Sequence, residues 1–152
     1  MIRFFKLIIV LLVVFSLTGC FGENYDFSPP TVSVFTPNGI NEQEKLAEAN
    51  IDWNYDEKYN KETKDILSLA KKQNKMSFNS GQQVELSLEN GDFNPNGISV
   101  SVWQKENKID LEYQKNDQSF YLPKEKGEYM IVVDLNADSG NAQYVGSIVI
   151  QW

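Results

Sequence analysis

Hydrophobic and polar residues alternate over most of the chain after residue 45, and this alternation predicts β-strands. In residues 46–55, LAEANIDWNY, one face carries the hydrophobic side chains of Ala47, Ala49, Ile51, Trp53 and Tyr55. The residues between them are polar or charged. Because successive side chains of a strand point to opposite faces, we predict a strand with one buried face.

Shorter alternating segments, separated by Gly, Pro and Asn, continue to residue 152. Beyond residues 46–55, the predicted strands cover residues 32–35, 83–90, 98–104, 108–114, 119–123, 127–136 and 143–152. Short strands that recur at intervals of about 8–12 residues are typical of an all-β sandwich. The predicted fold class is therefore mainly β, a sandwich of about seven or eight strands.

Three of these segments resemble strands of immunoglobulin-like or fibronectin type III-like domains. GQQVELSLEN, ISVSVWQ and LPKEKGEYMIVVDL are similar to strands B, C and F, and Tyr129 stands where such domains often place a corner tyrosine. The resemblance covers residues 76–152 but lacks the cysteine pair of antibody domains. Trp103 would be the core tryptophan of strand C, yet its parity is opposite to that of Val100 and Val102. Either Trp103 faces a second layer or the register slips there.

Residues 62–74 are the one segment with helical periodicity, and we predict one short helix near these positions. The hydrophobic side of the pattern consists of Tyr59, Ile66, Leu69 and Ala70, and the lysines away from it are Lys64, Lys71 and Lys72.

The predicted helix belongs to a basic stretch. Residues 58–75 hold six lysines but only Glu62 and Asp65, a formal charge of +4, whereas the chain as a whole carries −7. Such a stretch could bind anionic lipid headgroups or a polyanionic cell-wall polymer. The alternative is the solvated face of a helix.

The N-terminal segment follows a third pattern. Arg3 and Lys6 precede an unbroken apolar run, residues 7–15, and Gly19 stands before Cys20, the only cysteine. The run is shorter than the roughly 20 residues that span a bilayer, and this order is typical of a cleavable signal peptide. Residues 17–20, Leu-Thr-Gly-Cys, resemble the lipobox of bacterial lipoproteins, and the Lys- and Asn-rich chain is similar to small lipoproteins of Bacillus-like bacteria.

The lipobox resemblance implies that a signal peptidase recognises Leu17, Thr18 and Gly19, and cleaves before a Cys20 whose sulfur carries a diacylglyceryl group. The implied location is the extracytoplasmic side of the cell membrane, with the bilayer bound through the lipid. The resulting division is residues 1–19 as signal peptide, 20–30 as lipidated tether and 31–152 as a single domain, in which 31–75 form N-terminal strands plus the helix and 76–152 the immunoglobulin-like strands.

The amino-acid composition excludes several kinds of catalytic site, metal site and partner. The chain has no histidine, which excludes catalytic triads with a histidine base and histidine-ligated metal sites. Removing residues 1–19 leaves 12 of the 14 basic residues and all 21 acidic ones, a formal charge of −9. An acidic surface argues against a nucleic-acid partner. We predict no cofactor and no catalytic residue.

Two loops have the oxygen-rich spacing of calcium sites. Asp92, Asn94 and Asn96 follow the D-x-N-x-N-G order of a calcium loop, but position 12 is Trp103 in place of Glu. A second loop alternates oxygen-bearing side chains in a similar way: Asp134, Asn136 and Asp138. Turns rich in Gly, Asn and Pro explain both loops, so we predict no metal, with Asp92, Asn94 and Asn96 as the calcium candidates.

Carboxylates also lie near aromatic residues: Asp52, Asp56 and Glu57 beside Trp53, Tyr55 and Tyr59. Paired carboxylates and aromatics occur in glycosidases and sugar-binding faces. The alternative is a strand with solvated acids on one face and core aromatics on the other.

Together these patterns predict a membrane-anchored extracytoplasmic lipoprotein whose domain is a non-catalytic binding or accessory module for a protein partner or a cell-wall polymer. The alternative is a carboxylate-based glycan hydrolase or a calcium-dependent carbohydrate-binding module. Fold alone does not decide between them.

Overall fold

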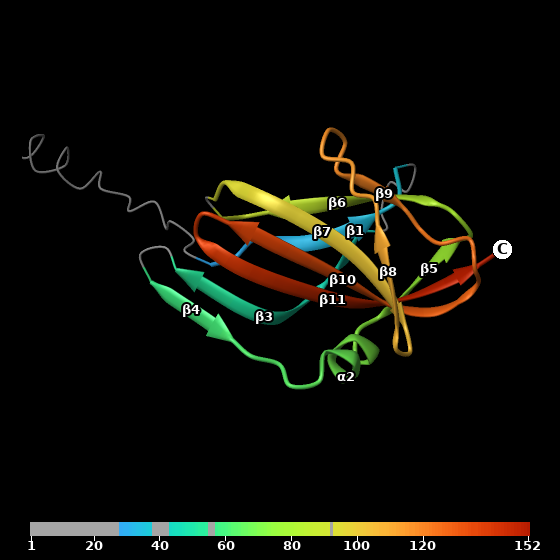
Figure 1. Ribbon diagram of the computed structural model, residues 1–152, viewed down its shortest axis with the longest axis horizontal. Helices are drawn as coiled ribbons and strands as arrows, with labels where there is room; N and C mark the ends of the chain where they lie inside the picture. The colour runs from blue at the N-terminus through green and yellow to red at the C-terminus, as the bar shows by residue number, and fades with distance from the viewer. Residues whose placement is uncertain (1–27, 38–42, 55–56, 92) are drawn as a thin grey trace, which may run out of the picture.

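The computed structural model describes residues 28–37, 43–54, 57–91 and 93–152, which form two packed β-sheets (Figure 1). Several predicted features lie outside the described residues: the signal peptide with Leu17, Thr18 and Gly19, the lipidation site Cys20, and Tyr55, Asp56 and Asp92. Within the described part of the chain, no helix is long and apolar enough to cross a bilayer.

The smaller sheet has four antiparallel strands, in the order β2 (Glu44–Lys45), β1 (Thr31–Phe35), β6 (Gln83–Glu89) and β9 (Ser119–Tyr121). The larger sheet has seven strands, in the order β4 (Lys58–Lys61), β3 (Ala47–Asn54), β11 (Gly140–Gln151), β10 (Gly127–Ala137), β7 (Pro95–Gln104) and β8 (Asn107–Leu111). Its seventh strand, β5 (Lys75–Asn79), pairs in parallel with the second half of β11.

The predicted immunoglobulin-like sandwich is confirmed, but the described residues form eleven strands where about seven or eight were predicted. The segments resembling strands B, C and F are β6, β7 and β10, and each pairs as that assignment requires: β6 with β1 and β9, and β10 with β7 and β11. Tyr129 is the third residue of β10, and its hydroxyl donates a 3.0 Å hydrogen bond to the backbone carbonyl of Glu125. This is the geometry of a tyrosine corner, as its position in the sequence indicated.

An additional segment, residues 36–74, separates β1 from β5. It contains β2, β3, β4 and the helix α2 (Ile66–Lys71). Strands β3 and β4 extend the larger sheet beyond β11, and α2 packs on the outer face of that sheet against β3, β10 and β11. The segment therefore covers one face of the larger sheet and also supplies Leu46, Ile51 and Trp53 to the core between the two sheets.

The helix is shorter than the predicted residues 62–74. Thr63 is held in the link from β4, because its backbone N–H donates to Asn50 Oδ1 at 2.8 Å and its hydroxyl to the Ala49 carbonyl at 2.6 Å. Asp65 then caps the helix by accepting from the backbone N–H of Ser68 at 2.9 Å. Tyr59 belongs to β4, so its assignment to the helix face was wrong.

The predicted single face of residues 46–55 is also wrong in part. Ile51 and Trp53 face the interior between the sheets, but Ala47 and Ala49 contact the outer cluster beneath α2. Gln143 pairs with Asn50 and Tyr144 with Glu48, which leaves Ala49 without a partner in the ladder. This β-bulge reverses which side chains of β3 point inward.

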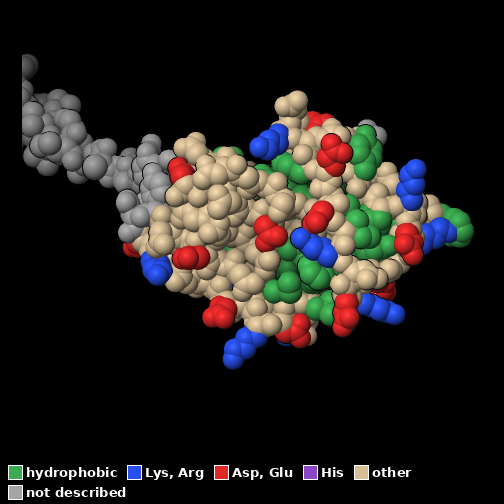
Figure 2. Space-filling view, in the orientation of Figure 1, with side chains coloured by type: hydrophobic (Ala, Val, Ile, Leu, Met, Phe, Trp, Pro, Cys, Tyr) green, Lys and Arg blue, Asp and Glu red, His purple; other side chains and the backbone are tan. Residues whose placement is uncertain are grey.

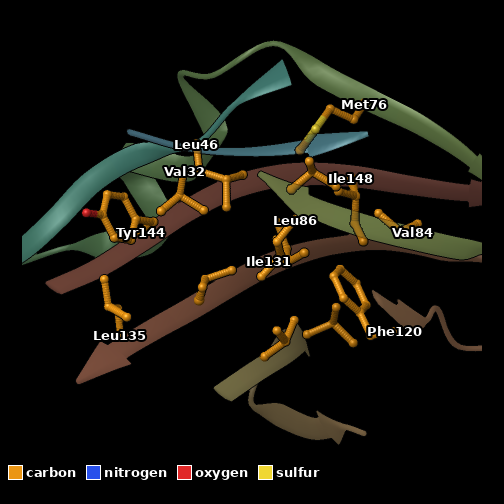
Figure 3. Packing of buried hydrophobic residues seen from close by; sticks show 14 of the residues in the cluster. Val32, Leu46, Met76, Val84, Leu86, Phe120, Ile131, Leu135, Tyr144 and Ile148 are labelled. Atoms are coloured by element: carbon orange, nitrogen blue, oxygen red, sulfur yellow. The ribbon is translucent and has the colours of Figure 1, made fainter. Parts of the chain in front are cut away.

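The main core fills the space between the sheets. Side chains from the smaller sheet, Val32, Val84, Leu86 and Phe120, meet those of the larger sheet, including Ile131, Leu135, Tyr144 and Ile148 (Figure 3). A second, smaller cluster lies beneath α2 on the opposite face of the larger sheet, where Ala70 packs against Met130, Val132 and Val145. Burial of apolar surface contributes roughly 25 cal/mol per Å², so both clusters stabilise the larger sheet.

Tyr144 connects the core to the start of the domain. Its side chain is fully buried, and its hydroxyl donates a 2.6 Å hydrogen bond to the backbone carbonyl of Pro30, just before β1. Burial, with a smaller effect of the Glu48 charge, raises the pKa of Tyr144 well above its ordinary value of 10.0. The neutral phenol is therefore the form that the folded domain retains.

Gly140 should be intolerant of a side chain. Its φ is +137°, and a Cβ there would overlap the backbone carbonyl oxygen of Asp52 on β3. We expect Gly140→Ala to lower the free energy of unfolding by about 2 kcal/mol or more, because neither the φ angle nor a strand backbone relaxes cheaply. Gly97→Ala is the matched control: no atom lies within 4 Å of its Cβ position, so the change should stay within about 1 kcal/mol in urea denaturation. Equal effects of the two substitutions would contradict this packing.

The stability of the domain should depend on the Tyr144 phenol at alkaline pH. Because the folded-state pKa is raised, the contribution of Tyr144 is complete below about pH 10 and is lost as the pH rises towards the folded-state value. Tyr144→Phe should cost about 1–2 kcal/mol at neutral pH and should flatten the fall of the unfolding free energy above about pH 10. Tyr121→Phe, at a residue 53% exposed, should keep the slope of the parent protein. If the unfolding free energy of Tyr144→Phe fell with pH as steeply as that of the parent protein, the raised pKa of Tyr144 would be refuted.

Candidate binding surface

The outer face of the larger sheet carries the candidate surface. Helix α2 packs on this face against β3, β10 and β11, and the face has two hollows, one lined in part by α2 and one lined by strand residues alone. Figure 2 shows hydrophobic side chains gathered around α2 and β8, whereas the part of the face nearer to β3 and β4 shows few hydrophobic side chains and several acidic and basic ones. Both hollows are lined by polar and apolar residues, and they differ in the elements that supply these residues.

The first hollow, called here the polar hollow, has a volume of about 490 Å³ and is lined by side chains that include Asn50, Ser99, Asp134, Asn136, Asn141 and Gln143. These residues lie on β3, β11, β10 and β7, at neighbouring register positions. The hollow is open and lies directly on the sheet, so its polar groups are fixed by strand pairing.

Most of the hydrogen-bonding groups of the polar hollow bind one another. Asn50 Nδ2 donates to Gln143 Oε1 at 2.7 Å, and Gln143 Nε2 donates to Asp134 Oδ1 at 2.8 Å. Asn136 Nδ2 donates to Asn141 Oδ1 at 2.6 Å. Cross-strand pairs of this kind stabilise a sheet by roughly 0.2–1 kcal/mol each. The pairing of the strands alone therefore explains these side-chain hydrogen bonds.

The second hollow, called here the helix groove, has a volume of about 540 Å³ and lies between α2 and the β7–β8 hairpin. Its lining includes Leu67, Lys71, Trp103, Lys105, Glu128 and Met130. Leu67 is 41% exposed although it is apolar, and Met130 is buried on the floor. A concave surface with an apolar floor and a few polar groups is typical of a binding site.

Trp103 is the distinctive residue of the helix groove. It pairs with Met130 in unbroken register and packs against the cluster beneath α2, so it faces a second layer, one of the two alternatives that its parity left open. Its indole Nε1 is buried, yet it has no hydrogen-bond partner among the described residues. A buried polar group without a partner costs about 1–3 kcal/mol of stability.

The charges around the helix groove are unevenly paired. Lys75 Nζ donates a 2.6 Å hydrogen bond to Glu128 Oε1 in an ion pair, and this bond lowers the pKa of Glu128. Lys71 and Lys105 have no ion-pair partner within 4 Å in the described part of the chain, where the other ion pair joins Lys108 to Asp110. The groove therefore has a locally cationic rim on a chain whose formal charge is −7.

The two calcium-like loops lie side by side, which the sequence did not indicate. The Asp138 carboxylate accepts from the backbone N–H of Asn94 at 3.0 Å and from its Nδ2 at 3.3 Å, and the first of these bonds is the main cause that lowers the pKa of Asp138. Asn96 is exposed on β7, and Asp92 lies outside the described residues. No three acidic or cysteine side chains converge on a metal-sized space within the described ranges.

The carboxylates proposed beside aromatic residues are not brought together on β3. Asp52 is exposed on the outer face, whereas Trp53 is only 1% exposed and faces the main core. Tyr59 donates instead to Glu48 at 2.8 Å, and this bond raises the pKa of Tyr59. Glu57 is exposed before β4, and Asp56 and Tyr55 lie outside the described residues.

Sequence reasoning missed the helix groove because its lining comes from five elements, α2, β7, β8, β10 and β11. The available signals were the parity of Trp103 and the hydrophobic residues of the predicted helix. Neither signal indicates that α2 and the β7–β8 hairpin flank the same stretch of β10, which depends on the pairing order of the sheet.

Comparison with known proteins assigns no family. No protein-family model and no curated protein matches the chain. Among solved structures, an engineered protein matches with 12% sequence identity and a TM-score of 0.38, over 53% of this chain and 19% of that chain. The chain thus spans less than a fifth of that structure, and the likeness carries no functional argument.

Trp103→Phe removes the unpartnered N–H. We expect the free energy of unfolding to stay within about 1 kcal/mol of the parent value or to rise, because the relieved desolvation penalty offsets the smaller buried ring. Trp53→Phe makes the same change in the main core and should be clearly more destabilising, because it leaves a cavity. Urea denaturation of both variants measures the difference, and an equal loss would contradict the unpartnered state of Nε1.

Proposed function

We propose that this protein is a membrane-anchored extracytoplasmic lipoprotein whose immunoglobulin-like domain acts as a non-catalytic binding or accessory module. The lipid on Cys20 holds the chain at the membrane, and residues 20–30 lift the domain from it. Each buried CH₂ of a lipid chain contributes about 0.8 kcal/mol, and two chains are needed for a durable anchor. The diacylglyceryl group implied by the lipobox meets that requirement.

The observation that carries the binding role is the helix groove. The additional segment between β1 and β5 supplies one wall of the groove, on a sandwich whose two sheets already pack against each other. The buried, unpartnered indole N–H of Trp103 is costly in a domain that binds nothing, and Leu67 adds an exposed apolar side chain beside it. The outer face of the larger sheet is therefore the binding surface that we propose.

The contacts of the described residues favour neither alternative function. Asp52 and Trp53 point to opposite faces of β3, so they do not form a sugar-binding platform. The Asp138 carboxylate accepts hydrogen bonds from the backbone and side-chain N–H groups of Asn94, and these bonds link the two loops. The non-catalytic module is accordingly the function that we carry forward.

Cys20→Ser should release the protein from the membrane. In cells fed a fatty-acid analogue, we expect the parent chain in the membrane fraction with label, and the variant without label and largely outside that fraction. Asn24→Ala, a matched change in the tether, should behave like the parent. A Cys20→Ser chain that is processed and stays in the membrane fraction would reject the lipid anchor.

A further inference from the structure

We propose that the helix groove binds an acidic, partly hydrophobic peptide segment of a partner protein. This inference rests on the proposed function, because it names the class of partner for the same surface. Three properties of the groove support it: an unpartnered donor, a cationic rim and an apolar floor.

The unpartnered Nε1–H of Trp103 requires a hydrogen-bond acceptor from the bound ligand. Trp103 lines the helix groove, and its Nε1 is the one buried side-chain polar atom of the described residues without a hydrogen-bond partner. A backbone carbonyl or a carboxylate of a bound peptide supplies that acceptor after a small shift of the indole. In the polar hollow, by contrast, amide and carboxylate groups already bind one another, so an incoming ligand gains less there.

Two lysines at the rim of the helix groove favour an acidic ligand over a basic one. Lys71 and Lys105 flank the groove from opposite sides, one on α2 and one at the hairpin turn, and neither forms an ion pair within the described ranges. Glu128 is engaged by Lys75. Besides the hydrogen bonds that Glu128 and Asp65 accept, the Lys71 charge lowers the pKa values of both carboxylates, so Lys105 is the more available cation for an acidic segment. A basic segment meets like charge at both lysines, and this discrimination weakens with added salt.

The floor favours a peptide over the other anionic ligands of a cell envelope. A polyol phosphate chain has no hydrophobic group to cover Leu67 and Met130. A bilayer surface is planar, whereas these residues line a concave groove of about 540 Å³. A peptide supplies a hydrophobic anchor, backbone acceptors and carboxylates together.

The test uses the purified full chain in detergent and three sets of dye-labelled, capped peptides of about ten residues. Leucine and phenylalanine alternate with aspartate and glutamate in the first set, with serine and glutamine in the second, and with lysine and arginine in the third. We expect the acidic set to bind about tenfold tighter than the neutral set at low salt, with the basic set weakest.

Two variants and one spectrum locate the site. Lys105→Glu should weaken binding of the acidic set by about fivefold or more, whereas Lys58→Glu, the same change on β4 at the opposite edge of the sheet, should have no effect. In an indole N–H spectrum, the Trp103 signal, assigned with Trp103→Phe, should move downfield on peptide binding. The signals of Trp53 and Trp152 should remain in place.

Equal affinity for the three sets, an unaffected Lys105→Glu variant or an unmoved Trp103 signal would each overturn the proposal. So would binding of phosphatidylglycerol vesicles or polyglycerol phosphate that is lost in Lys105→Glu while the acidic peptides do not bind. Any of these results, with Cys20→Ser still released from membranes, would reject the peptide groove and leave the lipid anchor standing. The reverse combination would reject the anchor alone.

Discussion

The structure depends on the pairing of one strand, β11, with three others. Its twelve residues pair with β10 along their length, with β3 in the first half and with β5 in the second. The change of partner occurs at Gly146, where a Cβ would lie 2.6 Å from Leu46 Cδ2 and 3.0 Å from Met76 Cε. Because no side chain occupies that point, Leu46 and Met76 pack there within the main core.

The same strand also supports both sides of the larger sheet. Tyr144 and Ile148 fill the main core, and Val145, between them, packs beneath α2. A helix of six residues is too short to be stable by itself, so its position depends on this contact and on the Asp65 cap. The helix groove is thus a consequence of how β11 and β10 present their outer faces, and the proposed binding surface is tied to the core by alternate residues of the same strands.

Much of the fold could be predicted from the sequence, because β6, β7, β10 and β11 alternate strongly and end at turn residues. The tyrosine corner was also evident from Tyr129. Strands β2, β4 and β5, the bulge in β3 and the length of α2 were not predicted. The segment KYNK of β4 is exposed throughout and has no hydrophobic alternation, so it resembled the start of a helix.

The bulge at Ala49 depends on the register of β11, and the length of α2 depends on the Thr63 hydrogen bonds to β3. Both arise from contacts between segments far apart in the chain. The surface was harder still to predict, because the groove depends on which strands are neighbours. The calcium-like loops show the converse, since Asn94 and Asp138 have metal-ligand chemistry but bind each other.

Amide hydrogen exchange in native membranes, compared with the purified chain in detergent, tests the central claim most directly. If the outer face of the larger sheet is the binding surface, exchange of α2 and the β7–β8 hairpin should be slower in native membranes, and the difference should disappear on purification. Strands β1, β6 and β9 should exchange equally in both samples. Equal exchange throughout, or slower exchange confined to the smaller sheet, would contradict the account.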